Sequence, residues 1–178
     1  MTTSTHVYIG TSLDGFIARP DGDFAWLSKF ADDDAINAYD EFMAGIDALV
    51  IGRGTFETVL TFPTWPYNKP VFVLSRSIKE VPEPLRDKVS ILTLTPAQML
   101  EHLGEKGFRS AYIDGGKVIQ SFLAADLIDE LIISKVPVLI GSGIPLFGSI
   151  DADICYNHVR TTVCSNGLVR SYYNKQPI

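Results

Sequence analysis

Three short segments of this chain place glycines, hydroxyls and cationic side chains directly after apolar runs. In chain order the segments are Gly52-Arg53-Gly54-Thr55, Ser75-Arg76-Ser77 and Asp114-Gly115-Gly116-Lys117. Glycines let the backbone come close to a phosphate, and guanidinium and hydroxyl groups bind phosphate oxygens. Together the three segments predict a site for a ligand that carries several phosphates.

Each segment taken alone is also consistent with an ordinary tight turn that carries a surface cation. None of them has the full GxGxxG or GxxxxGK[ST] pattern, so neither a Rossmann fingerprint nor a P-loop is predicted. The prediction rests on the repetition of the same strand–turn–helix arrangement three times in one short chain.

The elements that must position these segments alternate along the chain. Short, β-branched apolar runs suit buried strands of a largely parallel sheet, and they cover residues 7–9, 48–51, 71–74, 90–94, 111–113 and 131–140. The intervening stretches have helical spacing, with apolar stripes at Ile36-Tyr39-Met43-Ile46, Met99-Leu100-Leu103 and Val118-Ile119-Phe122-Leu123. Asp32 to Asp34 and Thr95-Pro96 suit the starts of the first two helices.

The C-terminal part has a different pattern. Two alternating runs, 159–164 and 168–173, flank Asn166-Gly167, which is a strong signal for a β-hairpin. We therefore predict an α/β fold, a single-domain mixed and mostly parallel twisted sheet with helices on both faces and a C-terminal antiparallel hairpin. One domain over residues 1–178 fits the length of the chain.

Composition narrows the class of protein. The net charge is −6, from 21 acidic and 15 basic residues, which argues against binding to nucleic acids or anionic membranes. No apolar run reaches 18 residues and the N-terminus does not resemble a signal peptide, so we expect a cytoplasmic protein. Two cysteines without a CxxC motif and three widely separated histidines predict no metal site.

The order and spacing of the motifs resemble the dihydrofolate-reductase-like superfamily. Within it, the chain resembles the reductase domain of bifunctional riboflavin-biosynthesis deaminase–reductases, the RibD C-terminal family, in its stand-alone bacterial form. The resemblance covers residues 7–173 and rests on five segments, which are 12–18, 52–55, 74–77, 114–116 and 136–147. It implies an NADPH-dependent reductase that acts as a homodimer on a small-molecule substrate.

The resemblance also implies roles for individual residues. The segment 52–55 would bind the pyrophosphate and adenosine side of NADPH, and Ser75 and Arg76 would hold the 2′-phosphate. Gly115 and Gly116 would let the backbone approach the cofactor, and a cis peptide bond between them is one way to achieve this. The full cofactor set is Gly10, Ile17, Ala18, Gly52, Arg53, Gly54, Thr55, Ser75, Arg76, Ser77, Asp114, Gly115, Gly116, Lys117 and Val118. Gly10, Ile17 and Ala18 would contact the nicotinamide.

On the substrate side the resemblance points to Trp26, Tyr39 and Ser134. Asp14, in a Ser-Leu-Asp-Gly motif, is the candidate catalytic acid, although an Asp before a glycine also suits a simple turn. True dihydrofolate reductases carry a carboxylate on the first helix, and the matching stretch here centres on the apolar Ile36.

These features favour an NADPH-dependent reductase of a small heterocycle, resembling 5-amino-6-(5-phosphoribosylamino)uracil reductase. Two alternatives stay open. One is dihydrofolate reductase, which the missing helix acid disfavours. The other is a non-catalytic nucleotide-binding protein or sensor that keeps only the cofactor cleft. The chain has no zinc ligands of the kind found in the deaminase domain, so we expect a stand-alone reductase.

Overall fold

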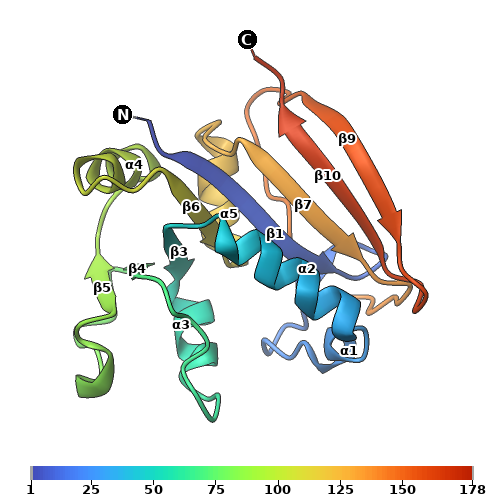
Figure 1. The fold of residues 1–178 in the computed structure, drawn as a ribbon, viewed down its shortest axis with the longest axis horizontal. Coiled ribbons are helices and arrows are strands. Elements are labelled where there is room, and N and C mark those ends of the chain that lie inside the picture. The colour runs from blue at the N-terminus through green and yellow to red at the C-terminus, as the bar shows by residue number, and fades with distance from the viewer. Residues whose placement is uncertain (1, 178) are drawn as a thin grey trace.

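An eight-stranded sheet runs through the whole molecule in the computed structural model, which describes residues 2–177. The strand order is β5-β4-β3-β6-β1-β7-β10-β9 (Figure 1). The strands are β1 (Ser4–Thr11), β3 (Ala48–Gly52), β4 (Val71–Leu74), β5 (Val89–Leu92), β6 (Ser110–Asp114), β7 (Glu130–Lys135), β9 (Tyr156–Val163) and β10 (Val169–Lys175). A second, two-stranded sheet pairs β2 (Phe16–Ala18) with β8 (Ile144–Pro145).

Within the eight-stranded sheet, neighbouring strands from β5 to β7 pair in parallel, and β10 pairs antiparallel with both β7 and β9. The predicted mixed, mostly parallel sheet is therefore confirmed. The hairpin forms around Asn166, whose side-chain oxygen accepts the Leu168 N–H at 3.0 Å, and Gly167, whose φ is +88°. This positive φ is the reason for a glycine at the turn.

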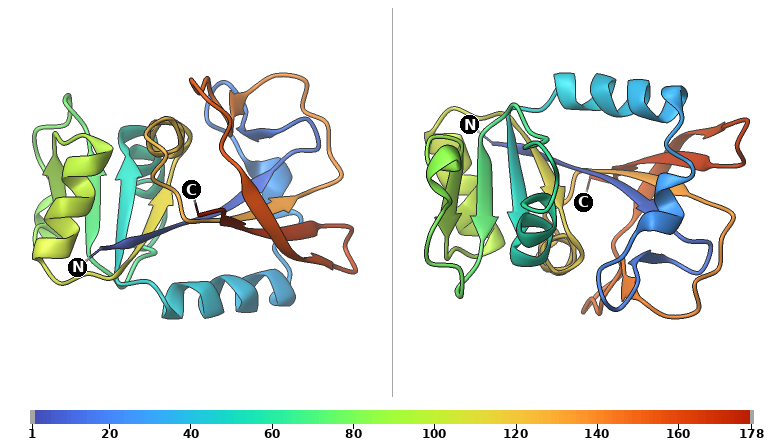
Figure 2. Two further views of the ribbon diagram at one scale, coloured as in Figure 1. Left: turned by 90° about the horizontal axis from the view of Figure 1, so that it is seen from above. Right: turned by 90° about the horizontal axis from the view of Figure 1, so that it is seen from below.

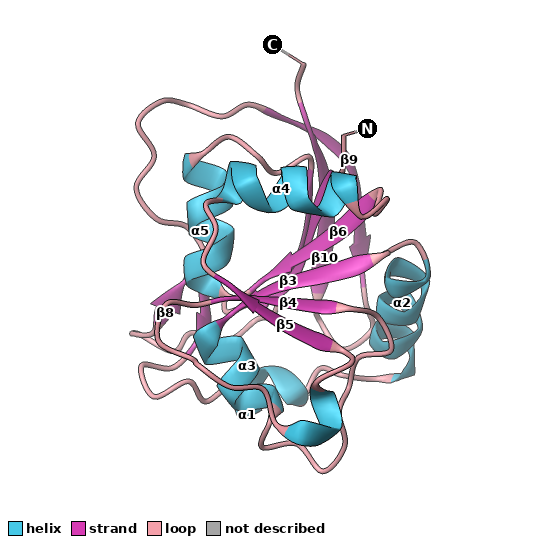
Figure 3. Cartoon of the chain, turned by 90° about the vertical axis from the view of Figure 1, so that its left-hand side faces the viewer, coloured by secondary structure: helices cyan, strands magenta, loops and turns pink. Residues whose placement is uncertain are grey.

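Helices cover both faces of the sheet, as Figure 3 shows. They are α1 (Ala25–Ser28), α2 (Asp33–Ala44), α3 (Arg53–Val59), the 3-10 helix η1 (Glu83–Leu85), α4 (Pro96–Glu105) and α5 (Gly116–Ala124). α4 and α5 pack on one face, and α2 and α3 pack on the other. β3 is buried on both faces because Val50 points to the first layer and Leu49 to the second.

Local signals explain where the helices begin. The Asp32 side chain accepts the Ala35 N–H at 2.9 Å and caps α2. Thr95 and Gln98 form a capping box at the start of α4, with proline at the first helical position. These caps satisfy backbone donors that a helix cannot pair internally, so the starts of both helices follow from the sequence.

Two details of the sequence prediction were wrong. β7 ends at Lys135, and residues 136–140 form a loop, because Pro137 lacks the N–H that a continuing strand would donate. The stripe on α2, which lies along one side of the sheet (Figure 2), does not include Ile36, whose side chain is 50% exposed. Tyr39 and Met43 pack against the core, and Ile46 is buried just beyond the helix end.

Candidate active-site cleft

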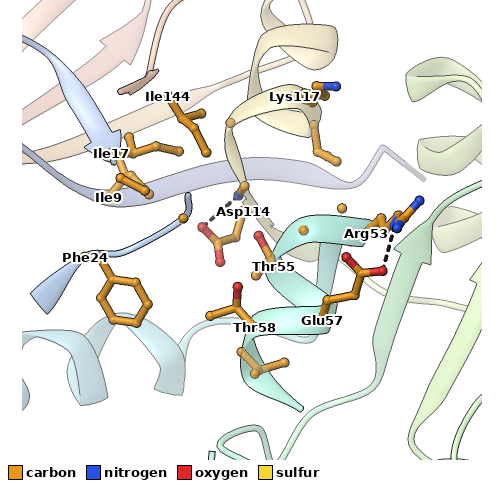
Figure 4. Close-up of a pocket in the computed structure, with 18 of the residues that line it drawn as sticks. Ile9, Ile17, Phe24, Arg53, Thr55, Glu57, Thr58, Asp114, Lys117 and Ile144 are labelled. Atoms are coloured by element: carbon orange, nitrogen blue, oxygen red, sulfur yellow. Dashed lines mark hydrogen bonds and ion pairs between the residues drawn. The ribbon is translucent and has the colours of Figure 1, made fainter. Parts of the chain in front are cut away.

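A cleft of about 1200 Å³ opens where β3, β4 and β6 end. In a parallel sheet the carboxyl ends of the strands carry the turns that lead into the next helices, and ligands commonly bind there. β2 and the segment before α1 line the opposite side of the cleft. Figure 4 shows side chains from these elements converging on it.

All of the residues predicted from the sequence to contact the cofactor line this one cleft. The three glycine- and cation-containing segments, far apart in the chain, meet because β3 lies between β4 and β6. Gly10, Ile17 and Ala18 line the cleft from β1 and β2. The roles of the single residues toward a cofactor stay predictions.

The β6–α5 turn passes against α3 so closely that it needs glycine. Gly115 has φ +95°, and a Cβ there would lie 2.5 Å from Thr55 Oγ1. At Gly116 a Cβ would lie 3.0 Å from Ile144 and 3.1 Å from Ile17. The peptide between the two glycines is trans rather than cis. The turn is therefore a backbone cradle that any larger residue would fill.

The first turn of α5 has backbone donors without a side-chain cap. The N-cap residue is Gly115, and the first hydrogen bond of the helix runs from Ile119 N–H to the Gly115 carbonyl at 2.9 Å. The N–H groups of Gly116, Lys117 and Val118 thus have no intrahelical acceptor. Free N–H groups and the helix dipole at this end suit a phosphate.

Arg53 joins two of the three segments. Its Nε donates to Glu57 Oε1 at 2.7 Å, and another guanidinium nitrogen donates to Ser77 Oγ at 3.2 Å. The Glu57 carboxylate therefore offsets the Arg53 charge. Within residues 2–177, Arg76 makes no ion pair. Arg76 is thus the unpaired guanidinium among the residues that line the cleft.

Asp114 lines the cleft at the end of β6, and its Oδ1 accepts the Gly115 N–H at 2.8 Å (Figure 4). Burial raises the pKa of Asp114 from 3.8 to about 6, against the opposing effect of the Gly115 hydrogen bond. A carboxyl group with this pKa is protonated in part near neutral pH, so it can donate a proton.

Asp14, the acid favoured by the sequence, does not line the cleft. Its carboxylate accepts the Gly141 N–H at 2.8 Å and the Ile140 N–H at 3.3 Å. The Ser12 hydroxyl and these backbone donors hold the pKa of Asp14 below its usual range. The position and charge of Asp14 therefore suit it to holding the loop after β7 rather than to donating a proton.

The three residues predicted on the substrate side also lie outside the cleft. Trp26, on α1, is 5% exposed and is buried in a small apolar cluster with Val136 and Leu168. The Tyr39 ring packs edge-on against Tyr8, with 5.6 Å between centroids. Ser134 Oγ accepts a hydrogen bond from Arg170 Nε at 3.0 Å. None of the three can contact a ligand in this cleft without a rearrangement.

Sequence reasoning missed other lining residues. Phe24 and Leu27 line the cleft beside Gly10, on either side of the buried Trp26. A Cβ on Gly10 would lie 2.6 Å from the tip of Leu27, so the glycine makes room for that side chain. The segment 20–27 has no periodic pattern that could reveal which of its aromatic and aliphatic side chains face a ligand.

Residues 6–169 match the family model described as the RibD C-terminal domain. The chain belongs to the RibD C-terminal domain family. Members of this family are RibD-like reductases, so the coarse class expected from the sequence holds. The cleft of this RibD C-terminal domain lies at the carboxyl ends of the parallel strands, within the matched residues.

Relatives of this RibD C-terminal domain have similar lengths. The uncharacterised protein YwjB of Bacillus subtilis is 35% identical over 151 residues, covering 83% of this chain and 84% of YwjB. A Shewanella sp. PV-4 protein, provisionally named as a riboflavin biosynthesis protein, has 39% identity and a TM-score of 0.92, covering 98% of this chain and 100% of its own.

More distant solved structures share the fold. The Thermotoga maritima diaminohydroxyphosphoribosylaminopyrimidine deaminase/5-amino-6-(5-phosphoribosylamino)uracil reductase has 17% identity and a TM-score of 0.77, covering 98% of this chain and 57% of its own. Dihydrofolate reductase from Enterococcus faecalis, complexed with NADP(H) and RAB-propyl, has 16% identity and a TM-score of 0.68. The match covers 99% of this chain and 100% of the reductase. The dihydrofolate-reductase-like fold predicted from the sequence is therefore confirmed.

Two further observations concern absences. No helix within residues 2–177 is long and apolar enough to cross a membrane. In the same part of the chain, no group of three or more His, Cys, Asp or Glu side chains could hold a metal ion.

Proposed function

We propose that this chain is an NADPH-dependent reductase that transfers a hydride to a small heterocyclic substrate, resembling 5-amino-6-(5-phosphoribosylamino)uracil reductase. The observation that carries this proposal is a shared cleft. The three segments suited to binding phosphate and the residues expected to contact the nicotinamide all line it. Its volume of about 1200 Å³ is larger than the usual range for one small ligand. That size fits a dinucleotide together with a substrate.

The residues present fit NADPH. The uncapped first turn of α5 and the cradle at Gly115 and Gly116 suit the pyrophosphate, since a Cβ at either glycine would meet neighbouring atoms. Arg76, which has no ion-pair partner within residues 2–177, would hold the 2′-phosphate beside Ser75 and Ser77. When bound, NADPH supplies the hydride, and the protein supplies orientation and electrostatics.

Asp114 is the proton donor in this proposal. The Gly115 N–H binds Oδ1, so Oδ2 is the oxygen that can carry the proton. Burial keeps the pKa of Asp114 at about 6, which leaves a protonated fraction at neutral pH. The walls of the cleft near Asp114 include the apolar side chains of Ile9, Ile17 and Phe24.

The two alternatives gain no support. Asp40, the acid on α2 nearest to the position used by dihydrofolate reductases, is exposed and does not line the cleft. Nothing in the cleft favours a sensor over an enzyme, because an acid with a raised pKa is present among its residues. The homodimer and the cytoplasmic location expected from the sequence stay predictions.

The test is a titration of the purified protein with NADPH and with NADH, followed by tryptophan fluorescence. Arg76→Ala should weaken NADPH binding by roughly tenfold or more and leave NADH binding within about twofold, because NADH lacks the 2′-phosphate. Arg86→Ala, an exposed arginine outside the cleft, is the matched control. Equal losses for both cofactors would refute the role of Arg76. An absence of NADPH binding to the wild type would refute the function.

A further inference from the structure

Arg170 is a buried cation without a counter-charge. Arg170 is 4% exposed and is the second residue of β10. Its Nε donates to Ser134 Oγ at 3.0 Å, and its Cζ lies 5.4 Å from the centre of the Tyr8 ring. Among residues 2–177, no carboxylate forms an ion pair with it. A buried charge is costly unless it is paired, so this arrangement calls for an anion.

The polar groups around Arg170 are hydrogen-bond donors that lack acceptors. The Tyr8 hydroxyl is buried and has no hydrogen-bond partner in the part of the chain that the structure describes. Burial raises the pKa of Tyr8 to about 12, so Tyr8 stays neutral and does not serve as the counter-ion. Ser134 Oγ accepts from Arg170, which leaves its own hydrogen free to donate.

Arg170 is connected to the cleft by the register of the sheet. Gly10 pairs with Ser134 across β1 and β7, and Ser134 pairs with Arg170 across β7 and β10. Side chains of directly paired residues point to the same face of a sheet. Gly10, Ser134 and Arg170 therefore form a row on one face of the sheet. Gly10 lines the cleft, so this row leads from the cleft to the buried guanidinium.

One side chain covers the start of this row. The tip of Leu27 lies 2.6 Å from the place where a Cβ of Gly10 would be, so Leu27 occupies the space above the glycine. Leu27 also lines the cleft, from the short helix α1. A change of rotamer in a leucine is a small conformational step, and it would uncover Gly10, the first residue of this row.

We propose that Arg170, with Ser134 and Tyr8, binds a planar oxyanion of the substrate, either a carboxylate or an ionised oxygen of the heterocycle. This proposal rests on the proposed reductase function, which gives the position of the cofactor. It identifies the substrate class as an acidic heterocycle. The guanidinium is a planar fork of donors that matches such an edge in two parallel hydrogen bonds. Arg170 is then a specificity-determining residue, and the orphaned donors are satisfied when substrate is bound.

The test uses three pyrimidinedione probes in calorimetric titrations, with and without oxidised NADP⁺. Uracil is neutral, orotate carries a carboxylate, and 5-nitrouracil has an ionised ring at neutral pH. The wild type should bind at least one charged probe roughly tenfold tighter than uracil. Arg170→Met should remove this preference and leave NADP⁺ affinity within about twofold. Arg160→Met is the matched control, because Arg160 is an exposed arginine on the neighbouring strand β9.

The outcomes separate this inference from the proposed function. Equal binding of all three probes to the wild type, or a preference that survives in Arg170→Met, overturns the inference and leaves cofactor binding untouched. A preference for a charged probe that depends on Arg170, in a protein that does not bind NADP⁺, supports the anion site and overturns the reductase function. If Arg170→Met does not fold, Arg170→Lys keeps the charge but loses the planar fork, and the preference for the charged probe should then be clearly smaller than in the wild type.

Discussion

The same Asp-Gly dipeptide follows two neighbouring strands of the sheet and has opposite properties in the two places. Asp14-Gly15 lies three residues beyond β1, and Asp114-Gly115 lies at the end of β6, which pairs with β1 in parallel. Both glycines have positive φ, +89° and +95°. Asp14 is exposed and bound to the backbone of the loop after β7, whereas Asp114 lines the cleft.

The difference shows how environment decides the chemistry of identical residues. Hydrogen bonds from Ser12 and the backbone favour the charged form of Asp14 and lower its pKa. Burial disfavours the charged form of Asp114 and raises its pKa to about 6. One carboxyl is therefore a permanent acceptor for backbone N–H groups, and the other can carry a proton at the pH of a cell.

Asp114→Asn should give the largest effect. If Asp114 donates the proton, the variant loses roughly 10²–10³-fold in kcat/KM, the usual range for removal of a general acid. NADPH affinity should stay within about twofold, since the amide can still accept the Gly115 N–H. Asp14→Asn is the matched control for activity. Similar kcat/KM values for the two variants would contradict the assignment.

The pH dependence sharpens the same test. Wild-type kcat/KM should fall as pH rises through about 6, because only protonated Asp114 is active. Since the folded pKa lies above the unfolded one, the native state holds the proton more tightly, and stability falls as pH rises from about 4 to about 6. Asp114→Asn should remove this loss of stability. At pH 7 its free energy of unfolding should therefore be roughly 1–3 kcal/mol larger than that of the wild type.

The two glycines allow a second, smaller contrast. A Cβ at Gly15 would meet no atom within 4 Å, so Gly15→Ala should cost only about 1 kcal/mol for the positive φ. A Cβ at Gly115 would also lie 2.5 Å from Thr55 Oγ1, so Gly115→Ala should cost about 2–4 kcal/mol and weaken NADPH binding. Denaturant unfolding measures both values. In a Thr55→Ala background, Gly115→Ala should lower the free energy of unfolding by less than it does in the wild type. An equal loss in both backgrounds would mean that the clash with Thr55 does not cause it.

The smallest expected effect is that of Asp14→Asn on stability. The variant should have a slightly lower thermal midpoint at neutral pH, because the amide accepts the Ile140 and Gly141 N–H groups less strongly than the carboxylate does. The pKa of Asp14 is lowered in the folded state, so its stabilising effect is present above the ordinary value of 3.8 and is lost as pH falls through the folded pKa. Thermal midpoints of both proteins should therefore converge in acid. A difference that persists there would point to another cause.

Several elements were predictable because their signals are local. The turn at Asn166-Gly167 and the cap at Thr95 depend on residues a few positions apart, and both form as expected. The exposure of Ile36 was not predictable, because an apolar stripe does not show where the covering layer stops. The end of β7 did have a local signal in Pro137, which the continuous apolar run around it obscured.

The sequence by itself determined the alternation of strands and helices, the hairpin and the three segments that line one cleft, since each follows from short-range backbone preferences and from the shared edge of parallel strands. Only the tertiary structure decided that Asp114-Gly115 lines that cleft while Asp14-Gly15 does not, that Trp26 is packed away from it, and that Arg170 is buried with no ion-pair partner among residues 2–177. Burial and pairing depend on elements far apart in the chain, and the charge of a carboxyl or guanidinium group is stabilised or penalised by those surroundings.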